Sequence, residues 1–189
     1  AAISNEFAKH DDIFSSNYAY FSSYSTSWLA HAKAYTSMMV NRFGFNQSSQ
    51  IIEIASNDGY LLQYFKEKNI PVLGIEPTAN TAAEAQKKGI DSVIDFFGIY
   101  LATKLVAKGI KADLLLGNNV LAHVPDINDF VGGLKILLKD SGVITFEFPH
   151  LLQLIDKNQF DTIYHEHYSY LSAFSLKSLG KEFTDFARY

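Results

Sequence analysis

Four consecutive residues in the C-terminal part of the sequence carry groups that can move protons: Tyr164, His165, Glu166 and His167. Histidine is the usual general base at neutral pH, and neighbouring O–H or N–H donors can stabilise an oxyanion. Together with His150, the same histidines and Glu166 could instead bind a metal ion, because imidazole and carboxylate are common ligands. Tyrosine and histidine can also fill an interface or cap a turn. The spacing alone leaves proton transfer, metal binding and packing open.

The sequence around this cluster alternates between apolar and helical segments, which predicts the scaffold that positions it. Apolar, β-branched runs predict strands at Ile51–Ala55, Val72–Ile75, Ser92–Ile94, Asp113–Leu116 and Gly142–Phe146. The stretches between them predict helices at Tyr60–Lys68, Ala79–Lys88, Ile99–Lys108 and Ile127–Leu138. Alternation at intervals of about 20 residues is typical of right-handed βαβ units in a parallel sheet. The sequence therefore predicts a three-layer α/β fold with at least five parallel strands and flanking helices.

The first 45 residues differ from the rest and predict a helical segment that packs on this core. Their middle part is rich in Tyr and Ser and shows no clear period. From Trp28 to Phe43 apolar residues recur at helical spacing, with Ser27 as a candidate N-cap and Gly44 as a candidate helix end. We interpret the chain as a single domain, with residues 1–45 as its N-terminal segment and residues 46–189 as its α/β part.

Polar residues follow the ends of the predicted strands, at the edge where open α/β sheets bind their ligands. They are Ser56, Asn57, Asp58 and Gly59 after the first strand, Glu76 and Pro77 after the second, Asp95, Phe96 and Phe97 after the third, and Asn118 and Asn119 after the fourth. The first turn lacks the G-x-G-x-x-G pattern with which a backbone approaches a dinucleotide pyrophosphate. A dinucleotide site is therefore not indicated.

S-adenosylmethionine has no phosphate and fits this edge better. It needs a sharp turn beside its methionine portion, and Asn, Asp and Gly are residues that tolerate tight turns. Glu76 can accept hydrogen bonds from both ribose hydroxyls, Asp95 can meet the adenine amino group, and Phe96 can stack on the ring. The alternative is that Asn57–Gly59 is only a turn and Glu76 only a surface acid.

The composition excludes several classes of protein. The 189 residues are 48% hydrophobic and 19% charged, which is typical of a globular chain, and the net charge of −4 indicates no nucleic-acid partner. No apolar run approaches the roughly 20 residues that span a bilayer, so we expect no membrane partner.

The absence of cysteine excludes disulfides, thiolate zinc sites and a cysteine nucleophile in this sequence. No signal peptide is visible, which favours a cytoplasmic location. The many aromatic residues, 11 Tyr and 15 Phe, predict that some line a binding site.

Five segments in a fixed order carry a specific resemblance to a known family. They are Glu53–Gln63 (EIASNDGYLLQ), Gly74–Pro77 (GIEP), Asp95–Phe97 (DFF), Gly117–Pro125 (GNNVLAHVP) and Phe160–His167 (FDTIYHEH). Together they resemble the sugar C-methyltransferases, S-adenosylmethionine-dependent enzymes that methylate carbon 3 of 4-keto deoxysugar nucleotides. Tyr18–Tyr24 (YAYFSSY) also resembles the start of that family's catalytic domain. The resemblance spans nearly all of residues 13–175.

The resemblance implies a class I methyltransferase-like Rossmann fold, a sugar nucleotide as small-molecule substrate and the following site. For catalysis it implies His167 as the base, Glu166 and Tyr164 as its companions, His123 as a further pocket residue, and Tyr18 or Tyr20 as a tyrosine that reaches the pocket. For S-adenosylmethionine and its product S-adenosylhomocysteine it implies Glu53, Ala55, Ser56, Asn57, Asp58, Gly59, Glu76, Pro77, Asp95, Phe96, Phe97, Asn118 and Asn119. Carbon methylation requires a base, because a proton next to the ketone must be removed before the carbon can attack the methyl group.

The sequence departs from this family at both ends. The family begins with a small zinc module held by cysteines, and this sequence contains no cysteine. The family ends with a further domain that helps to hold the sugar nucleotide. In this sequence, no clear sixth or seventh strand is seen before Tyr189. We therefore expect no metal, and we expect the chain to be the middle of a longer protein or a shortened relative.

Two other functions stay open at this point. A cofactor-binding fragment would hold S-adenosylmethionine and turn over nothing by itself. A methyltransferase acting on oxygen or nitrogen would need only a base or a metal, and would make no special use of an enolate-stabilising cluster at Tyr164–His167.

Overall fold

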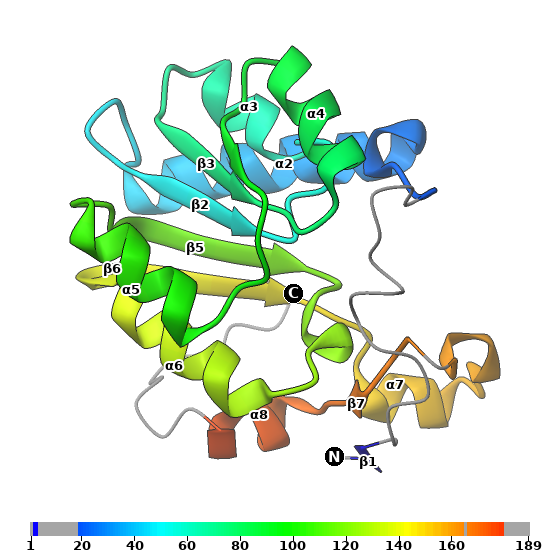
Figure 1. Ribbon diagram of the computed structural model, residues 1–189. Coiled ribbons are helices and arrows are strands. Elements are labelled where there is room, and N and C mark those ends of the chain that lie inside the picture. Colours follow the sequence, from blue (N-terminus) through cyan, green and yellow to red (C-terminus); the bar gives the residue numbers. More distant parts are fainter. Residues whose placement is uncertain (1, 4–18, 165, 180–189) are drawn as a thin grey trace.

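Five parallel strands form the central sheet of the computed structural model, which describes residues 2–3, 19–164 and 166–179. The strands are β2 (Ile51–Ile54), β3 (Val72–Ile75), β4 (Ser92–Val93), β5 (Ala112–Asn118) and β6 (Leu138–Glu147). Their order is β4-β3-β2-β5-β6, and every neighbouring pair is parallel. The arrowheads of β2, β3, β5 and β6 point the same way in Figure 1. The direction of winding reverses between β2 and β5, which creates the switch point where such sheets bind ligands.

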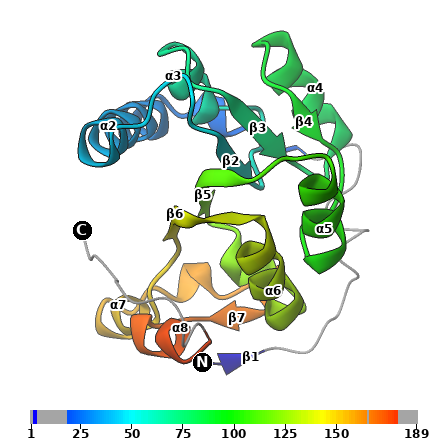
Figure 2. The same cartoon turned by 90° about the vertical axis from the view of Figure 1, so that its left-hand side faces the viewer.

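Helices cover both faces of this sheet, as the sequence predicts. The helices on one face are α2 (Thr26–Phe43), α3 (Leu62–Lys66) and α4 (Ala79–Lys87), and those on the other are α5 (Ile99–Ala107) and α6 (Ile127–Leu137). Leu114 and Leu116 of β5 pack in the first of these layers and Leu115 in the second, because successive strand residues face opposite ways. Figure 2 shows α2 and α3 on one side of the sheet and α5 and α6 on the other. Among the described residues, no helix combines the length and the apolar character needed to cross a membrane.

Several element boundaries differ from the prediction, and three of the differences have a clear structural form. The N-cap of α2 is Ser25 rather than Ser27, since the Ser25 hydroxyl accepts the Trp28 N–H at 3.2 Å and Ser27 lies inside the helix. The predicted helix from Tyr60 is shorter, because Tyr60 and Leu61 belong to the turn that precedes α3. Strand β6 begins at Leu138 rather than Gly142, with an irregular pairing to β5 in its first half. The end of α2 at Gly44, which has a left-handed φ of 69°, is as predicted.

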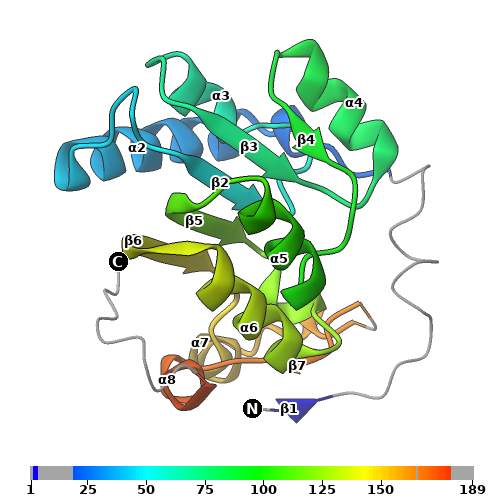
Figure 3. The same cartoon turned by 60° about the vertical axis from the view of Figure 1, so that its left-hand side comes forward.

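A group of short elements that the sequence did not indicate lies beyond the β6 edge of the sheet. It consists of β1 (Ala2–Ile3), α7 (Leu151–Asp156), η3 (Phe160–Thr162), β7 (Ser169–Tyr170) and α8 (Ala173–Leu179). β1 and β7 pair antiparallel with each other and do not join the main sheet. Figure 3 shows α7, α8 and this strand pair together next to α6 and β6. Two further short helices, η1 (Ser22–Tyr24) and η2 (Leu121–His123), lie near the carboxyl ends of the strands.

Gly59 lies where the turn after β2 packs against the region of α4. Its φ is +73°, and a Cβ built on it would lie 2.5 Å from Ile90 Cδ1 and 3.2 Å from Ala85 Cβ. The matched control is Gly109, which has a φ of +79° and nothing within 4 Å of such a Cβ. We expect Gly59→Ala to lower the free energy of unfolding by about 1–2 kcal/mol more than Gly109→Ala, since only Gly59→Ala overpacks the core. Urea unfolding measures the difference, and equal losses in the two variants would contradict it.

Candidate active site

A cavity of about 980 Å³ lies at the carboxyl ends of the strands, at the switch point between β2 and β5. It brings together most of the predicted site residues: Tyr20, Ala55, Asn57, Glu76, Pro77, Asp95, Phe96, Phe97, Asn118, Asn119, His123, Tyr164, Glu166 and His167 all line it. Segments more than 100 residues apart in the sequence therefore meet in one place. Tyr18 and His165 lie outside the described residues.

Four predicted cofactor residues do not line the cavity. Glu53 and Ser56 are fully buried, and Asp58 is 3% exposed. Gly59 packs against Ile90 and Ala85, as described above. These residues lie within or behind the turn after β2, so their part in binding a ligand is to shape that turn.

The turn after β2 is held from β3 by a buried carboxylate. Asn57 adopts a φ of 49°, a left-handed conformation that asparagine tolerates. Glu76, only 4% exposed, accepts the Asn57 N–H through Oε2 at 2.8 Å and the Thr78 N–H through Oε1 at 2.9 Å. Each carboxylate oxygen has two lone pairs, so Glu76 can hold the turn and still accept a hydrogen bond from a ligand in the cavity.

Glu53, in the central strand β2, is a buried acid directly behind this turn. Its side chain is 0% exposed, and neither carboxylate oxygen has a partner of good hydrogen-bond geometry among the described residues. Burial raises the pKa of Glu53 well above its ordinary value, and the charges of Glu76 and Asp58 add to this, while the nearby Tyr60 hydroxyl acts in the opposite direction. The environment therefore favours the neutral acid.

The loop after β4 supplies two aromatic rings to the cavity wall, one exposed and one half-buried. Phe96 is 38% exposed, and its N–H donates to Asp95 Oδ1 at 2.9 Å. Phe97 packs edge-on against Phe130 of α6, with ring centroids 5.3 Å apart. The loop is thus anchored by Phe97, which leaves Phe96 exposed at the wall where a flat ring could stack.

Two histidines meet at the far side of the cavity. The rings of His123 and His167 lie edge to face with centroids 4.7 Å apart. His123 Nδ1 is 3.0 Å from the Glu166 carbonyl oxygen, and His167 Nδ1 is 3.0 Å from the Thr162 carbonyl oxygen. Burial lowers the pKa of His123 to about 4, with a further contribution from His167, and burial also lowers the pKa of His167. Both imidazoles are therefore neutral at physiological pH.

Two tyrosines line the cavity beside this pair. The Tyr164 ring lies 4.1 Å from the His167 ring, centroid to centroid. Burial, with the charge of Glu166, raises the pKa of Tyr164, so its hydroxyl keeps its proton and can act as a donor. Tyr20 approaches from the N-terminal segment and is 57% exposed.

The cavity wall includes aromatic residues that the sequence assigned only to helices. Trp28 stacks on Tyr60 with centroids 5.9 Å apart, and the Asn118 amide donates to the Tyr60 hydroxyl at 3.2 Å. Trp28 also stacks on His31, whose Nε2 lies 2.7 Å from Glu147 Oε2 at the end of β6. The sequence indicated Tyr60 as a cavity residue only through its position directly after the turn, within the segment Glu53–Gln63.

The metal alternative finds no support in the described part of the chain. There, no three His, Asp or Glu side chains form a group that could hold an ion. His150 Nε2 instead accepts the Ala173 N–H at 3.0 Å, at the start of α8. That the protein carries no metal stays a prediction.

The charged groups that line the cavity are acidic. They are Glu76, Asp95, Asp126, Asp129 and Glu166, and no Lys or Arg of the described residues lines it. Such a wall repels phosphate and attracts cations. It suits a ligand that carries a positive sulfonium and no phosphate, and it disfavours a dinucleotide.

Comparison with known proteins agrees with this geometry. Residues 28–184 match the family described as "Methyltransferase domain". The chain is 32% identical over 168 residues to C-methyltransferase NovU of Streptomyces niveus, an alignment that covers 89% of this chain and 40% of NovU, so the chain spans about 40% of that relative's length.

Solved structures share the fold at low sequence identity. A SAM dependent methyltransferase from Archaeoglobus fulgidus superposes with a TM-score of 0.58 at 15% identity, over 79% of this chain and 67% of that one. The plantazolicin methyltransferase BpumL in complex with SAH gives a TM-score of 0.60 at 15% identity, over 82% of this chain and 62% of that one. The chain belongs to the methyltransferase domain family and has the class I fold of the S-adenosylmethionine-dependent methyltransferases.

Proposed function

We propose that this domain transfers a methyl group from S-adenosylmethionine to a carbon next to a ketone, in a 4-keto deoxysugar nucleotide. The observation that carries the proposal is the pair of neutral histidines, His123 and His167, in the same cavity as the cofactor edge. The match to C-methyltransferase NovU and the resemblance in Phe160–His167 support the choice of carbon as the acceptor atom.

The cofactor edge would hold S-adenosylmethionine through three groups. Glu76 Oε1 accepts both the Thr78 N–H and the Thr78 hydroxyl, so the lone pair left for a ribose hydroxyl is on Oε2, which accepts the Asn57 N–H. Phe96 has the exposed ring for adenine, and the acidic wall suits the sulfonium. When bound, the cofactor supplies an electrophilic methyl group on a positively charged sulfur.

The hydrogen bond to Thr162 defines which nitrogen of His167 can act as a base. A carbonyl oxygen can only accept, so His167 Nδ1 must carry the proton that it donates to Thr162. In the neutral ring the lone pair then lies on Nε2. We infer that His167 Nε2 removes the proton next to the ketone, and that the electrons of the broken C–H bond form an enolate.

We infer that Tyr164 stabilises the enolate oxygen. Its hydroxyl keeps its proton, its ring lies beside the His167 ring, and the residue lines the same cavity. A donor aimed at developing negative charge typically contributes a large share of catalysis. The enolate carbon then attacks the methyl group, and the electrons of the broken C–S bond stay on sulfur, which leaves S-adenosylhomocysteine.

The acidic wall also limits which part of the acceptor enters the cavity. A diphosphate would meet Asp126, Asp129 and Glu166 with no Lys or Arg of the described residues on the wall to offset them. We therefore place the uncharged keto-sugar ring in the cavity and the diphosphate outside it.

Product analysis tests this function. We expect the protein to bind S-adenosylhomocysteine in calorimetry, and to convert a panel of 4-keto deoxysugar nucleotides with labelled S-adenosylmethionine into products whose methyl group NMR locates on carbon. It should also exchange the proton next to the ketone with deuterated solvent.

Other outcomes favour the other functions. A methyl group on oxygen or nitrogen without such exchange would replace carbon methylation. Cofactor binding with no turnover of any acceptor in the panel would indicate a cofactor-binding fragment.

A further inference from the structure

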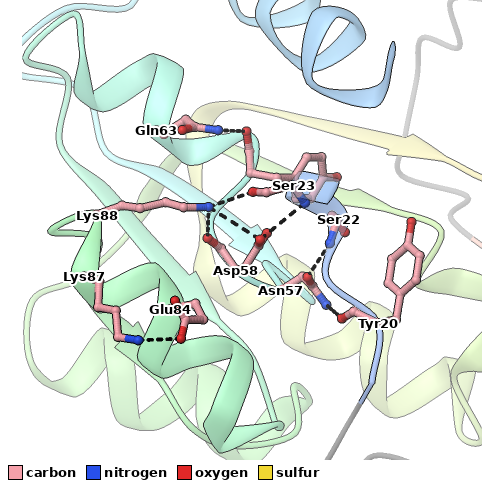
Figure 4. Close-up of polar contacts among 10 residues, drawn as sticks. Tyr20, Ser22, Ser23, Asn57, Asp58, Gln63, Glu84, Lys87 and Lys88 are labelled. Atoms are coloured by element: carbon pink, nitrogen blue, oxygen red, sulfur yellow. Dashed lines mark hydrogen bonds and ion pairs between the residues drawn. The ribbon is translucent and has the colours of Figure 1, made fainter. Parts of the chain in front are cut away.

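The segment Tyr20–Tyr24 crosses the turn after β2 and is bound to it by side chains of that turn. The Ser22 N–H donates to Asn57 Oδ1 at 2.9 Å, and the Asn57 amide donates to the Tyr20 carbonyl at 3.1 Å. The Ser23 N–H donates to Asp58 Oδ2 at 3.3 Å. Figure 4 shows Asn57 and Asp58 reaching to this segment, with Tyr20 at its start.

Lys88, just after α4, joins the same contact from the other side. Its Nζ donates to the Asp58 carbonyl at 2.7 Å and to the Ser23 hydroxyl at 2.7 Å, and lies 3.5 Å from Asp58 Oδ2. The Lys88 side chain is 29% exposed and that of Asp58 is 4% exposed, so water screens this ion pair only partly. One ammonium group therefore ties the segment and the turn together (Figure 4).

The segment and the turn lie against each other, and both supply residues to the cavity wall. Asn57 lines the cavity from the turn next to Glu76, while Tyr20 and Ser22 line it from the segment. Asp58 and Lys88 are not part of the cavity wall. Any influence of these two residues on the acceptor must therefore pass through the segment or the turn that they join.

We propose that Asp58 and Lys88 are positioning residues that fix Tyr20 against the acceptor, so that the turn beneath the cofactor also sets the acceptor side of the cavity. The role of Tyr20 in this proposal rests on the proposed function. The attachment of Tyr20–Tyr24 to the turn does not rest on that function and can be measured without any activity.

The test compares Lys88→Met with Lys87→Met. Lys87 is the neighbouring residue and makes an exposed ion pair with Glu84 at 2.6 Å, with side chains 70% and 43% exposed, away from the segment (Figure 4). Both substitutions remove one ammonium group from the same end of α4. Lys88→Arg keeps the positive charge and several donors, and serves as the conservative variant.

The first measurement is amide hydrogen exchange of Ser22 and Ser23 by NMR. We expect Lys88→Met to speed their exchange about 10-fold, since a charged donor is lost, and Lys87→Met to leave it unchanged. Unchanged exchange in Lys88→Met would overturn the proposal, whatever reaction the protein catalyses.

The second measurement is steady-state kinetics with a 4-keto deoxysugar nucleotide. We expect Lys88→Met to lower kcat/KM for this acceptor about 10-fold, with the affinity for S-adenosylhomocysteine nearly unchanged, and Lys88→Arg to recover most of the loss. In a Tyr20→Ala background, Lys88→Met should have little further effect, because the two residues act through one interaction.

The kinetic outcomes separate the two proposals. Faster exchange with an unchanged kcat/KM, or full additivity with Tyr20→Ala, would overturn the positioning of Tyr20 and leave the proposed function intact. An inactive wild-type protein would overturn the proposed function, while the exchange measurement would still decide whether Lys88 holds the segment.

Discussion

His167→Ala is expected to slow methyl transfer by about 10²–10⁴-fold, the contribution that a general base typically makes. The same variant should no longer exchange the proton next to the ketone with deuterated solvent. Affinity for S-adenosylhomocysteine should barely change, because His167 packs against His123, which follows β5, whereas Glu76 and Phe96 follow β3 and β4 on the other side of β2. Solvent exchange followed by NMR, together with calorimetry, measures both effects.

The control for this variant is His150→Ala. His150 bonds to the Ala173 N–H and does not line the cavity, so its loss should leave proton exchange intact. Exchange at the wild-type rate in His167→Ala would show that His167 is not the base and would direct attention to His123 and the tyrosines.

The pH profile gives a second check on His167. Burial lowers its pKa below the ordinary value of 6.5, so the neutral base predominates at pH 7 and above. We expect the wild-type exchange rate to be constant there and to fall as the pH drops through the lowered pKa, because the imidazolium has no lone pair to accept a proton. His167→Ala should lack this acid limb.

Glu76→Ala is expected to weaken cofactor binding by about 10- to 150-fold, because hydrogen bonds from ligand hydroxyls to a charged carboxylate are lost. The structure adds a second reason for a large effect, since Glu76 also accepts the Asn57 N–H and so holds the turn that lines the cavity. Calorimetry with S-adenosylhomocysteine measures the affinity.

A pair of further variants separates these two contributions. Glu76→Gln retains a side chain of the same shape with one acceptor oxygen, and should lose less affinity than Glu76→Ala. Glu84→Ala, which removes an exposed carboxylate of α4 that is paired with Lys87, should bind like the wild type. An unchanged affinity in Glu76→Ala would show that Glu76 does not bind the ribose.

The sheet was predictable because each strand carries its own signal. Ile51–Ile54 is buried along its whole length, and such strands appear in sequence as mainly apolar runs between helical segments, here interrupted by Glu53. The β1–β7 pair has no such signal. It joins Ala2–Ile3 to Ser169–Tyr170, which lie far apart in the sequence, and pairs this short depend on contacts that no local pattern records.

The candidate site was predictable only where its residues follow strand ends. Glu76 and Asn118 could be found because parallel strands end at one edge of a sheet. The stacking of Trp28 on Tyr60 could not, because the helical spacing of Trp28 is equally typical of a core residue. The attachment of Ser22 to Asn57 was also hidden, since it joins residues that are 35 positions apart through a side chain and a backbone amide.

The buried acid Glu53 makes the stability of this domain depend on pH, over a range that begins near its ordinary pKa of 4.5. Between its ordinary pKa of 4.5 and the raised value, Glu53 is ionised in the unfolded chain and protonated in the folded one. Folding therefore takes up a proton from solvent in this range, and Glu53 makes the folded state progressively less favourable as the pH rises through it. Paired surface carboxylates have the opposite effect, because they favour folding once ionised. The central strand of the sheet thus carries a group whose burial opposes folding increasingly as the pH rises.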